Sequence, residues 1–300
     1  MTRKLSPRAY EKLCLASYLS LFTIVISGGL VRLTGSGLGC SDWPKCNSER
    51  FIDVSSMHGA IEQINRLFTG VVAVLVIAAV LGSLFLEERR RSLTQLSLGL
   101  VVGVLAQVIL GAIVVLTGLN PFANMGHFLL SMVLIANAIV LYRQSRIAKN
   151  PVSDCSPQER KYVLLIGLLF ACAVISGTVV TASGPHAGDE NAVRFGFAIS
   201  SVARVHSAFV LLSLLVLLLV LLKVRKSHQT REFLEQRLAA FLGVGMLQAL
   251  VGYVQYFNGI PVILVATHLF GAALIWSLAV DTITVSGSAL SPPKIRSSSH

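Results

Sequence analysis

Charged residues are scarce in this 300-residue sequence: Asp, Glu, Lys and Arg make up 13% of it, whereas ordinary globular proteins contain about 25%. Hydrophobic residues make up 54%, and the mean hydropathy is +0.74. So little charge excludes a water-soluble domain. The composition predicts an integral membrane protein, whose apolar surface faces lipid.

Two further patterns are missing. We find no motif for NAD, flavin or ATP: the glycine-rich run Thr-Gly-Ser-Gly at 34–37 follows an apolar tract and precedes no strand–helix unit, so it is not a phosphate-binding loop. The apolar runs also lack the polar–apolar alternation of membrane strands, which excludes a transmembrane β-barrel.

What the sequence does have is long, uncharged apolar tracts. A membrane-spanning helix needs about 20 apolar residues. The tracts of that length cover residues 13–31, 67–86, 92–142, 162–188, 205–222 and 238–280. The third and the last are long enough for two helices each, with turns expected at 118–121 and 258–261, where Gly and Pro cluster. The sequence therefore predicts an all-α integral membrane fold with eight transmembrane helices.

The basic residues are distributed unevenly. Nineteen of the 25 Lys and Arg fall in the terminal segments and in alternate loops, whereas four (Arg32, Lys45, Arg50 and Arg194) fall in the other loops. By the positive-inside rule, this places both termini in the cytoplasm. The net charge of +11 then reflects topology and attraction to the lipid bilayer, with no nucleic-acid partner. The leader before the first tract is too short for a mitochondrial transit peptide, so we expect a multi-pass protein of a bacterial cell membrane.

Two of the five cysteines stand out by position. Cys40 and Cys46 lie in the first outside loop, in an oxidising compartment, which predicts a disulfide bond. A shared metal ion is the alternative, although no nearby His or Cys completes a tetrahedral set. Cys14, Cys155 and Cys172 are expected to be inert or reduced.

The two halves of the sequence repeat each other. Val-Ile-Ser-Gly at 25–28 recurs at 174–177, an offset of 149, and later matches share an offset of 141. The matches at 141 are Asn65 with His206, Gln107 with Gln248, Gly111 with Gly252, Gly118 with Gly259, and His127 with His268. The change in offset places eight extra residues in the first half, around the Cys40 and Cys46 loop. We therefore expect two domains, 1–150 and 151–300, each a four-helix bundle, related by a pseudo-twofold axis along the membrane normal.

Three histidines are expected at one depth, near the outer ends of their helices. They are His127, His206 and His268. Polar groups inside membrane spans are costly and by default mark function. Two neutral imidazoles facing each other across a bundle suit a six-coordinate haem iron, so His206 and His268 are the predicted ligands of a haem iron. The alternatives are hydrogen-bonded core histidines and zinc, for which no third ligand is evident.

The first half keeps His127 but has Asn65 where the repeat predicts a second histidine. An amide is a poor iron ligand, so a haem bound there would have His127 on one face and a weak or vacant position on the other.

Asn65 belongs to a polar stripe on its helix, formed by His58, Glu62, Asn65, Arg66 and Thr69. Glu62 either pairs with Arg66 four residues later or lies beside a reacting group. Arg66 and Arg204 suit haem carboxylates, or alternatively reach up to lipid headgroups. His186, Asp189 and Arg194 belong either to a solvated loop or to a lid over a pocket.

These residues together resemble a known family. The run from Gly28 to Cys40, then Asp-Trp-Pro at 42–44, Cys46, Ile-Glu at 61–62 and Asn-Arg at 65–66 are similar to the signature of haem A synthases. The duplicated eight-helix plan and the three histidines fit as well, so the resemblance covers nearly the whole chain.

The resemblance implies oxidation of the C8 methyl of haem O to a formyl group, giving haem A for cytochrome oxidases. It assigns haem b to His206 and His268, and the substrate haem to His127, with Glu62 near the reacting methyl. It also implies a Cys40–Cys46 disulfide at the pocket entrance, with haem O synthase and an unidentified electron donor as partners.

The departure from the family is Asn65, because a histidine usually follows the glutamate by three residues. We therefore expect a five-coordinate or weakly ligated substrate iron. The alternatives are a non-enzymatic b-type membrane cytochrome or haem carrier, and, in a third class, a transporter with parallel repeats.

Overall fold

Eight helices make up almost all of the computed structural model, which describes residues 4–146, 156–226 and 231–286. The helices are α1 (Pro7–Leu33), α2 (Met57–Leu84), α3 (Arg91–Leu116), α4 (Pro121–Ser145), α5 (Pro157–Ser183), α6 (Ile199–Val224), α7 (Arg231–Phe257) and α8 (Val262–Ser286). All eight are long and apolar enough to cross a membrane, and no β-strand occurs in the described part of the chain. The predicted all-α membrane fold is confirmed.

Local sequence signals explain where the helices begin. Ser6, Ser56, Asn120 and Ser156 cap helix N-termini with their side-chain oxygens, and prolines follow at 7, 121 and 157. A cap accepts a backbone N–H that the helix cannot satisfy, and proline at the first position lacks that N–H altogether. The signals at 6–7, 56 and 156–157 lie outside the apolar tracts, so these helices extend beyond them. The largest extension is in α2, which begins at Met57 although its apolar tract begins at 67.

The two predicted hairpins are both present. In the α3–α4 turn, Gly118 and Leu119 have φ values of 62° and 63°. In the α7–α8 turn, Gly259 and Ile260 have φ values of 75° and 60°. Each turn thus places a glycine and then a larger residue in the left-handed region, which L-residues with side chains rarely adopt. This shared backbone geometry supports the internal repeat.

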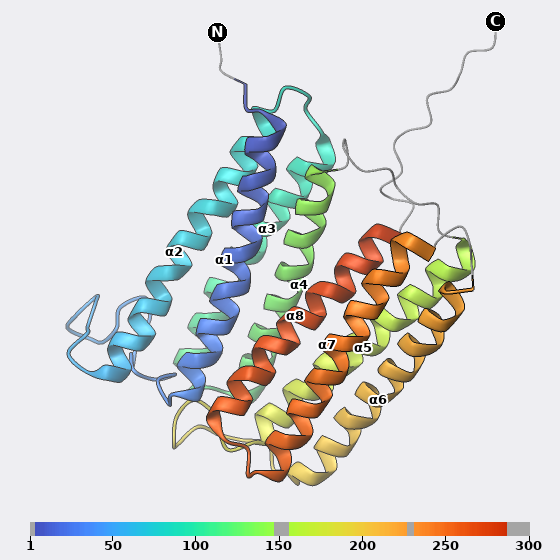
Figure 1. The fold of residues 1–300 in the computed structure, drawn as a ribbon. Coiled ribbons are helices and arrows are strands. Elements are labelled where there is room, and N and C mark those ends of the chain that lie inside the picture. The colour runs from blue at the N-terminus through green and yellow to red at the C-terminus, as the bar shows by residue number, and fades with distance from the viewer. Residues whose placement is uncertain (1–3, 147–155, 227–230, 287–300) are drawn as a thin grey trace, which may run out of the picture.

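The helices form two groups (Figure 1). In the first group, α1 contacts α2 and α4, and α3 contacts α2 and α4; in the second, α5 and α7 make the corresponding contacts with α6 and α8. The groups meet where α8 packs against α1 and α4, and where α4 contacts α5. The division into domains 1–150 and 151–300 stays a prediction, because its boundary lies outside the described residues, as does Cys155. The twofold relation between them stays a prediction.

The loops that bear on function lie at one end of the molecule, opposite the end where α1 begins and α8 finishes (Figure 1). The α1–α2 loop covers 34–56 and the α5–α6 loop covers 184–198, so the first is longer by the eight residues that the repeat predicted. Apolar side chains such as Val102, Ile109 and Leu168 are more than 60% exposed. In a chain of this class, that surface faces lipid.

Candidate functional site

A cavity of about 290 Å³ lies within the first helix group. Its walls come from all four helices and from the loops at 34–56 and 184–198, and they include Glu62, Asn65, Gln107 and His127. The size is close to the lower end of the range for ligand pockets, about 300–1,000 Å³. The cavity is largely apolar, with a few polar groups, as expected for a site that orients a large apolar ligand.

Asn65 and His127 reach this cavity from α2 and α4, which lie diagonally in the group. The Ser27 hydroxyl of α1 donates to Asn65 Oδ1 at 2.7 Å. His127 is held through its backbone, because Gln107 Nε2 donates to its carbonyl oxygen at 3.0 Å. Nδ1 of the His127 ring is buried and has no hydrogen-bond partner in the described residues. The ring is thus positioned by packing and left without a protein partner.

Glu62 and Arg66 form the ion pair that their spacing predicted. Arg66 Nη2 lies 2.5 Å from Glu62 Oε1, and Arg66 Nε donates to the same oxygen at 3.0 Å. The other oxygen, Oε2, accepts the backbone N–H of Cys40 at 2.7 Å. Glu62 is 5% exposed and lines the cavity. The carboxylate is therefore paired, as one alternative predicted, and it also lines the cavity; its place beside a reacting group stays a prediction.

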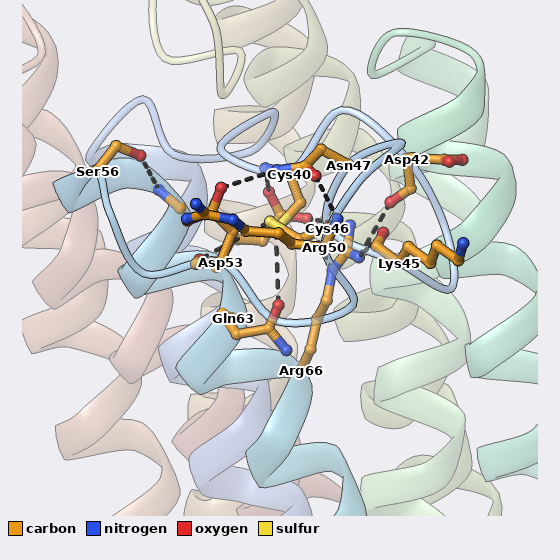
Figure 2. The surroundings of a disulfide bond; sticks show 12 residues. Cys40, Asp42, Lys45, Cys46, Asn47, Arg50, Asp53, Ser56, Gln63 and Arg66 are labelled. Atoms are coloured by element: carbon orange, nitrogen blue, oxygen red, sulfur yellow. Dashed lines mark hydrogen bonds and ion pairs between the residues drawn. A yellow bond between two sulfur atoms is a disulfide. The ribbon is translucent and has the colours of Figure 1, made fainter.

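The α1–α2 loop lies over the Arg66 side chain (Figure 2). Cys40 and Cys46 form the predicted disulfide, with an S–S distance of 2.06 Å. Within the loop, the carbonyl oxygens of Asp42 and Lys45 accept from Arg66 Nη1 at 3.1 and 3.2 Å. Arg66 therefore ties α2 to the loop and does not extend toward lipid headgroups.

The rest of the loop is pinned by Asp53. Its Oδ2 accepts from Asn47 Nδ2 at 2.8 Å, and its Oδ1 accepts from the backbone N–H of Ser55 at 3.0 Å. Hydrogen bonds from Ser55 and Asn47, together with the nearby Arg50, lower the pKa of the Asp53 carboxyl group. These contacts hold the loop at the start of α2.

The α5–α6 loop closes the cavity from the side of the second helix group. Ala187 and Gly188 line the cavity, and the Gly188 carbonyl oxygen accepts from the Gly37 N–H at 3.0 Å. Arg32 of α1 donates from Nε to the His186 carbonyl oxygen at 2.7 Å and from Nη2 to that of Thr181 at 3.0 Å. Of the two alternatives for this loop, the contacts favour a lid.

The polar residues of that loop serve to hold it. The His186 ring contacts the Ile260 carbonyl oxygen through Nε2 at 2.8 Å. Arg194 donates to the carbonyl oxygens of Gly184 and Pro185, and Asp189 accepts the Asn191 N–H. These side chains do not line the cavity.

His206 and His268 face each other in the second helix group, from the diagonal helices α6 and α8. Their ring centroids are 6.3 Å apart, with an interplanar angle of 80°. Nδ1 of His206 lies 2.9 Å from the Ala173 carbonyl oxygen, which can only accept. Nδ1 therefore carries the proton, which leaves Nε2 with a lone pair for a metal. Nδ1 of His268 is buried without a partner in the described part of the chain.

Repeat-related residues make matching contacts in the two groups. Ser176 Oγ lies 3.3 Å from His206 Nδ1, as Ser27 Oγ lies against Asn65. Gln248 Nε2 donates to the His268 carbonyl oxygen at 2.6 Å, as Gln107 does to that of His127.

A glycine lies against the ring of each of the three histidines. A Cβ on Gly111 would lie 3.4 Å from Cε1 of His127, one on Gly177 would lie 3.1 Å from Cε1 of His206, and one on Gly252 would lie 3.0 Å from Cε1 of His268. At each of these positions, glycine leaves room for the imidazole.

These residues fit an iron porphyrin. Two imidazoles that bind one metal from opposite sides, each at about 2 Å, have centroids roughly 6 Å apart, which matches the pair in the second group. The glycines beside all three rings leave them room, and the His206 ring carries its proton on Nδ1, so its Nε2 is able to bind a metal. No cluster of three or more His, Cys, Asp or Glu suited to a metal ion occurs among the described residues.

Other predicted site residues are placed elsewhere. His58 is exposed at the start of α2, and its Nδ1 lies 2.9 Å from Ser36 Oγ. Arg204 is exposed on α6 and has no side-chain partner in the described chain. The sequence did not predict three residues of the first cavity. Arg32 and Trp43 line it, and Ser27 orients the Asn65 side chain. The match of Ser27 with Ser176 in the repeat could have indicated that both serines contact the side chains at 65 and 206.

Comparison with known proteins agrees with this picture. Residues 11–58 and 51–188 match the family of cytochrome oxidase assembly proteins designated COX15-CtaA. The chain is also similar to proteins named "Heme A synthase" from Bacillus mycoides (strain KBAB4), Bacillus cereus (strain AH187) and Bacillus anthracis (strain A0248). Each is 33% identical to it over 135 residues, which is 45% of this chain and 43% of the relative. The match thus spans less than half the length of these curated relatives.

Proposed function

Because the chain belongs to the COX15-CtaA family of cytochrome oxidase assembly proteins, we propose that it is a haem A synthase, a membrane oxidoreductase that converts haem O to haem A. The reaction is oxidation of the C8 methyl of haem O to a formyl group. The observation that carries the proposal is the pair of unequal sites: two facing imidazoles in the second helix group, and one imidazole opposite an amide in the first.

The second helix group is assigned to a resident haem b. His206 and His268 would hold the iron, with Ala173 and Ser176 fixing the His206 ring so that Nε2 points away from α5. A haem with two histidine ligands supplies one-electron transfer, and here it would relay electrons from an unidentified donor to the first group. Exposed Arg204 of α6 would supply a cation for a haem carboxylate.

The first helix group is assigned to the substrate haem, received from haem O synthase. His127 would bind its iron from one side, and the apolar walls would exclude water from the reacting edge. Glu62, held by Arg66 and the Cys40 N–H, would place a fixed negative charge beside the C8 methyl. Because most Arg66 donors are already engaged, Arg32 is better placed than Arg66 for the substrate's own carboxylates.

The direct test is the haem content of bacterial cells that co-express the chain with a haem O synthase. Extracted haems are separated by chromatography and identified by mass spectrometry. We expect haem A in these cells and haem O alone when the chain is omitted. Haem O alone in both cultures would contradict the assignment of the chain as a haem A synthase.

A second test separates an enzyme from a non-enzymatic b-type cytochrome or haem carrier. Glu62→Gln keeps the size of the side chain but removes its charge, so we expect haem A formation to fall at least about 100-fold. The low-spin spectrum of haem b in the purified protein should be retained, because His206 and His268 are untouched. Unchanged haem A formation would contradict the role given to Glu62.

The same family assignment supports a multi-pass protein of a bacterial cell membrane. We propose that both termini are cytoplasmic, which places the loops at 34–56 and 184–198 on the outer side. Reporter fusions at the C-terminus would test this orientation, with a cytoplasmic reporter active and a periplasmic reporter inactive.

A further inference from the structure

Asn65 stands where the repeat places His206, yet the surroundings of the two residues are alike. In the second group, the Ala173 carbonyl oxygen and Ser176 Oγ contact the His206 ring. In the first, the repeat-related Ser27 hydroxyl contacts the Asn65 amide. The position is therefore built to orient a polar side chain, and here that side chain is a neutral amide.

The direction of the amide follows from its hydrogen bonds. A serine hydroxyl has one hydrogen to donate. Ser27 Oγ is 2.7 Å from Asn65 Oδ1 and 3.2 Å from the Ile24 carbonyl oxygen, so the shorter contact takes the hydrogen. This fixes Oδ1 toward α1. Nδ2 is left with two N–H groups and no partner in the described residues, while the side chain lines the cavity.

Three other polar side chains on the cavity wall are already engaged. Glu62 accepts from Arg66 and the Cys40 N–H, and it has no proton to donate as a paired carboxylate. Gln107 donates to the His127 carbonyl oxygen and to Ser131 Oγ, and the Thr69 hydroxyl donates to the Asn65 carbonyl oxygen. The Asn65 amide thus offers unengaged N–H groups on the wall across the group from His127.

We infer that Asn65 is a hydrogen-bond donor to a small oxygen-containing ligand on the porphyrin iron, of the class of water, hydroxide or dioxygen. An amide does not compete for the iron as a second imidazole would, so the position stays open to such a ligand. Ser27 acts as the positioning residue by fixing the amide direction. The inference rests on the proposed function, because it requires a porphyrin held by His127.

The test uses the purified full-length chain with His206→Ala and His268→Ala, so that added ferric haem occupies the first group alone. Fluoride serves as a probe that accepts hydrogen bonds strongly, and carbon monoxide, after reduction, as one that accepts weakly. Absorption spectra give the spin state and both affinities. We expect high-spin haem that binds both probes.

Three substitutions then report on the amide. Asn65→Leu should weaken fluoride binding about tenfold, the value of one hydrogen bond to a charged ligand, and change carbon monoxide affinity less than about twofold. Ser27→Ala should give a smaller loss of fluoride binding. Asn65→His should produce low-spin haem and block both probes. Ser20→Ala is the matched control and should change nothing, because its hydroxyl only donates to the Ser17 carbonyl oxygen of its own helix.

The outcomes separate the inference from the proposed function. Fluoride affinity that is unchanged by Asn65→Leu, or low-spin haem in the unsubstituted first group, would overturn the inference even if cells make haem A. Failure of the first group to bind any haem, together with no haem A in cells, would remove both. If the double histidine variant does not fold, the same titrations use the intact chain, where the six-coordinate haem b does not respond to fluoride.

Discussion

At the scale of single residues, a glycine lies close to one of the two facing imidazoles of the second helix group. Gly252 of α7 leaves a gap for His268, since a Cβ there would lie 3.0 Å from Cε1 of the ring. That separation is tighter than ordinary van der Waals contact, so the ring must shift to accept a methyl group. Gly243 lies on the same helix and has open space where a Cβ would go.

This pair of glycines gives a matched prediction. Gly252→Ala should displace His268 and lower the affinity for the proposed haem b about tenfold, with a high-spin component in the absorption spectrum. Gly243→Ala should leave the spectrum unchanged. Both substitutions should raise helix stability by up to about 1 kcal/mol, because alanine favours helix over glycine, so a loss of haem in the first variant cannot be ascribed to unfolding. Identical spectra for the two variants would contradict the role of Gly252.

At the scale of elements, the α1–α2 loop is the part of the chain that joins the disulfide to the charged pair of α2. It contributes an N–H to Glu62 and two carbonyl oxygens to Arg66. A six-residue separation between Cys40 and Cys46 restricts the segment that carries all three contacts. The disulfide therefore limits the conformations from which those contacts form.

Removing the disulfide should loosen the loop without unfolding the helices. For Cys40→Ser with Cys46→Ser, we expect a loss of about 2 kcal/mol of stability and faster hydrogen exchange at the Cys40 position, whose N–H is protected by Glu62 in the native loop. Thermal unfolding and hydrogen exchange with mass spectrometry measure the two effects. Cys172→Ser controls for loss of a sulfur, because Cys172 forms no disulfide. Equal exchange in all three proteins would show that the disulfide does not hold the loop.

Elements differ in how far the sequence predicts them. The helices and both hairpins follow from apolar length and from the Gly and Pro turns, and the Glu62–Arg66 pair follows from helical spacing. The facing of His206 and His268 follows from the repeat. The carbonyl contacts of Arg66 do not, because they depend on the path of an irregular loop, for which no periodic pattern exists. The lid contacts of Arg32 likewise join residues about 150 positions apart.

At the scale of the whole molecule, one carboxylate joins the two helix groups. Asp281 of α8 forms ion pairs with Arg143 of α4 and with Arg237 of α7, and its side chain is 16% exposed. Trp276 of α8 adds a hydrogen bond from Nε1 to the Met132 carbonyl oxygen of α4, at 2.8 Å. The two helix groups are thus joined by the ion pairs of Asp281 and by the hydrogen bond of Trp276.

Asp281→Asn should weaken this contact, because two arginines lose their shared anion. We expect a loss of about 1–3 kcal/mol, seen as a lower midpoint of thermal unfolding in detergent. Glu11→Gln is the control: Glu11 pairs with Arg146 inside the first group, in a more exposed setting, and should cost less than about 1 kcal/mol. A larger effect for Glu11 than for Asp281 would contradict this account of the interface.

The α5–α6 loop is the last part of the cavity wall in chain order. Ala187 and Gly188 complete the wall of a cavity whose other lining residues all lie between Leu21 and Leu134. During synthesis, the first four helices are therefore made before their pocket has its last wall, and the pocket stays open along that side until the chain has grown past Gly188. A chain that ended after α4 would therefore carry the pocket with that side open.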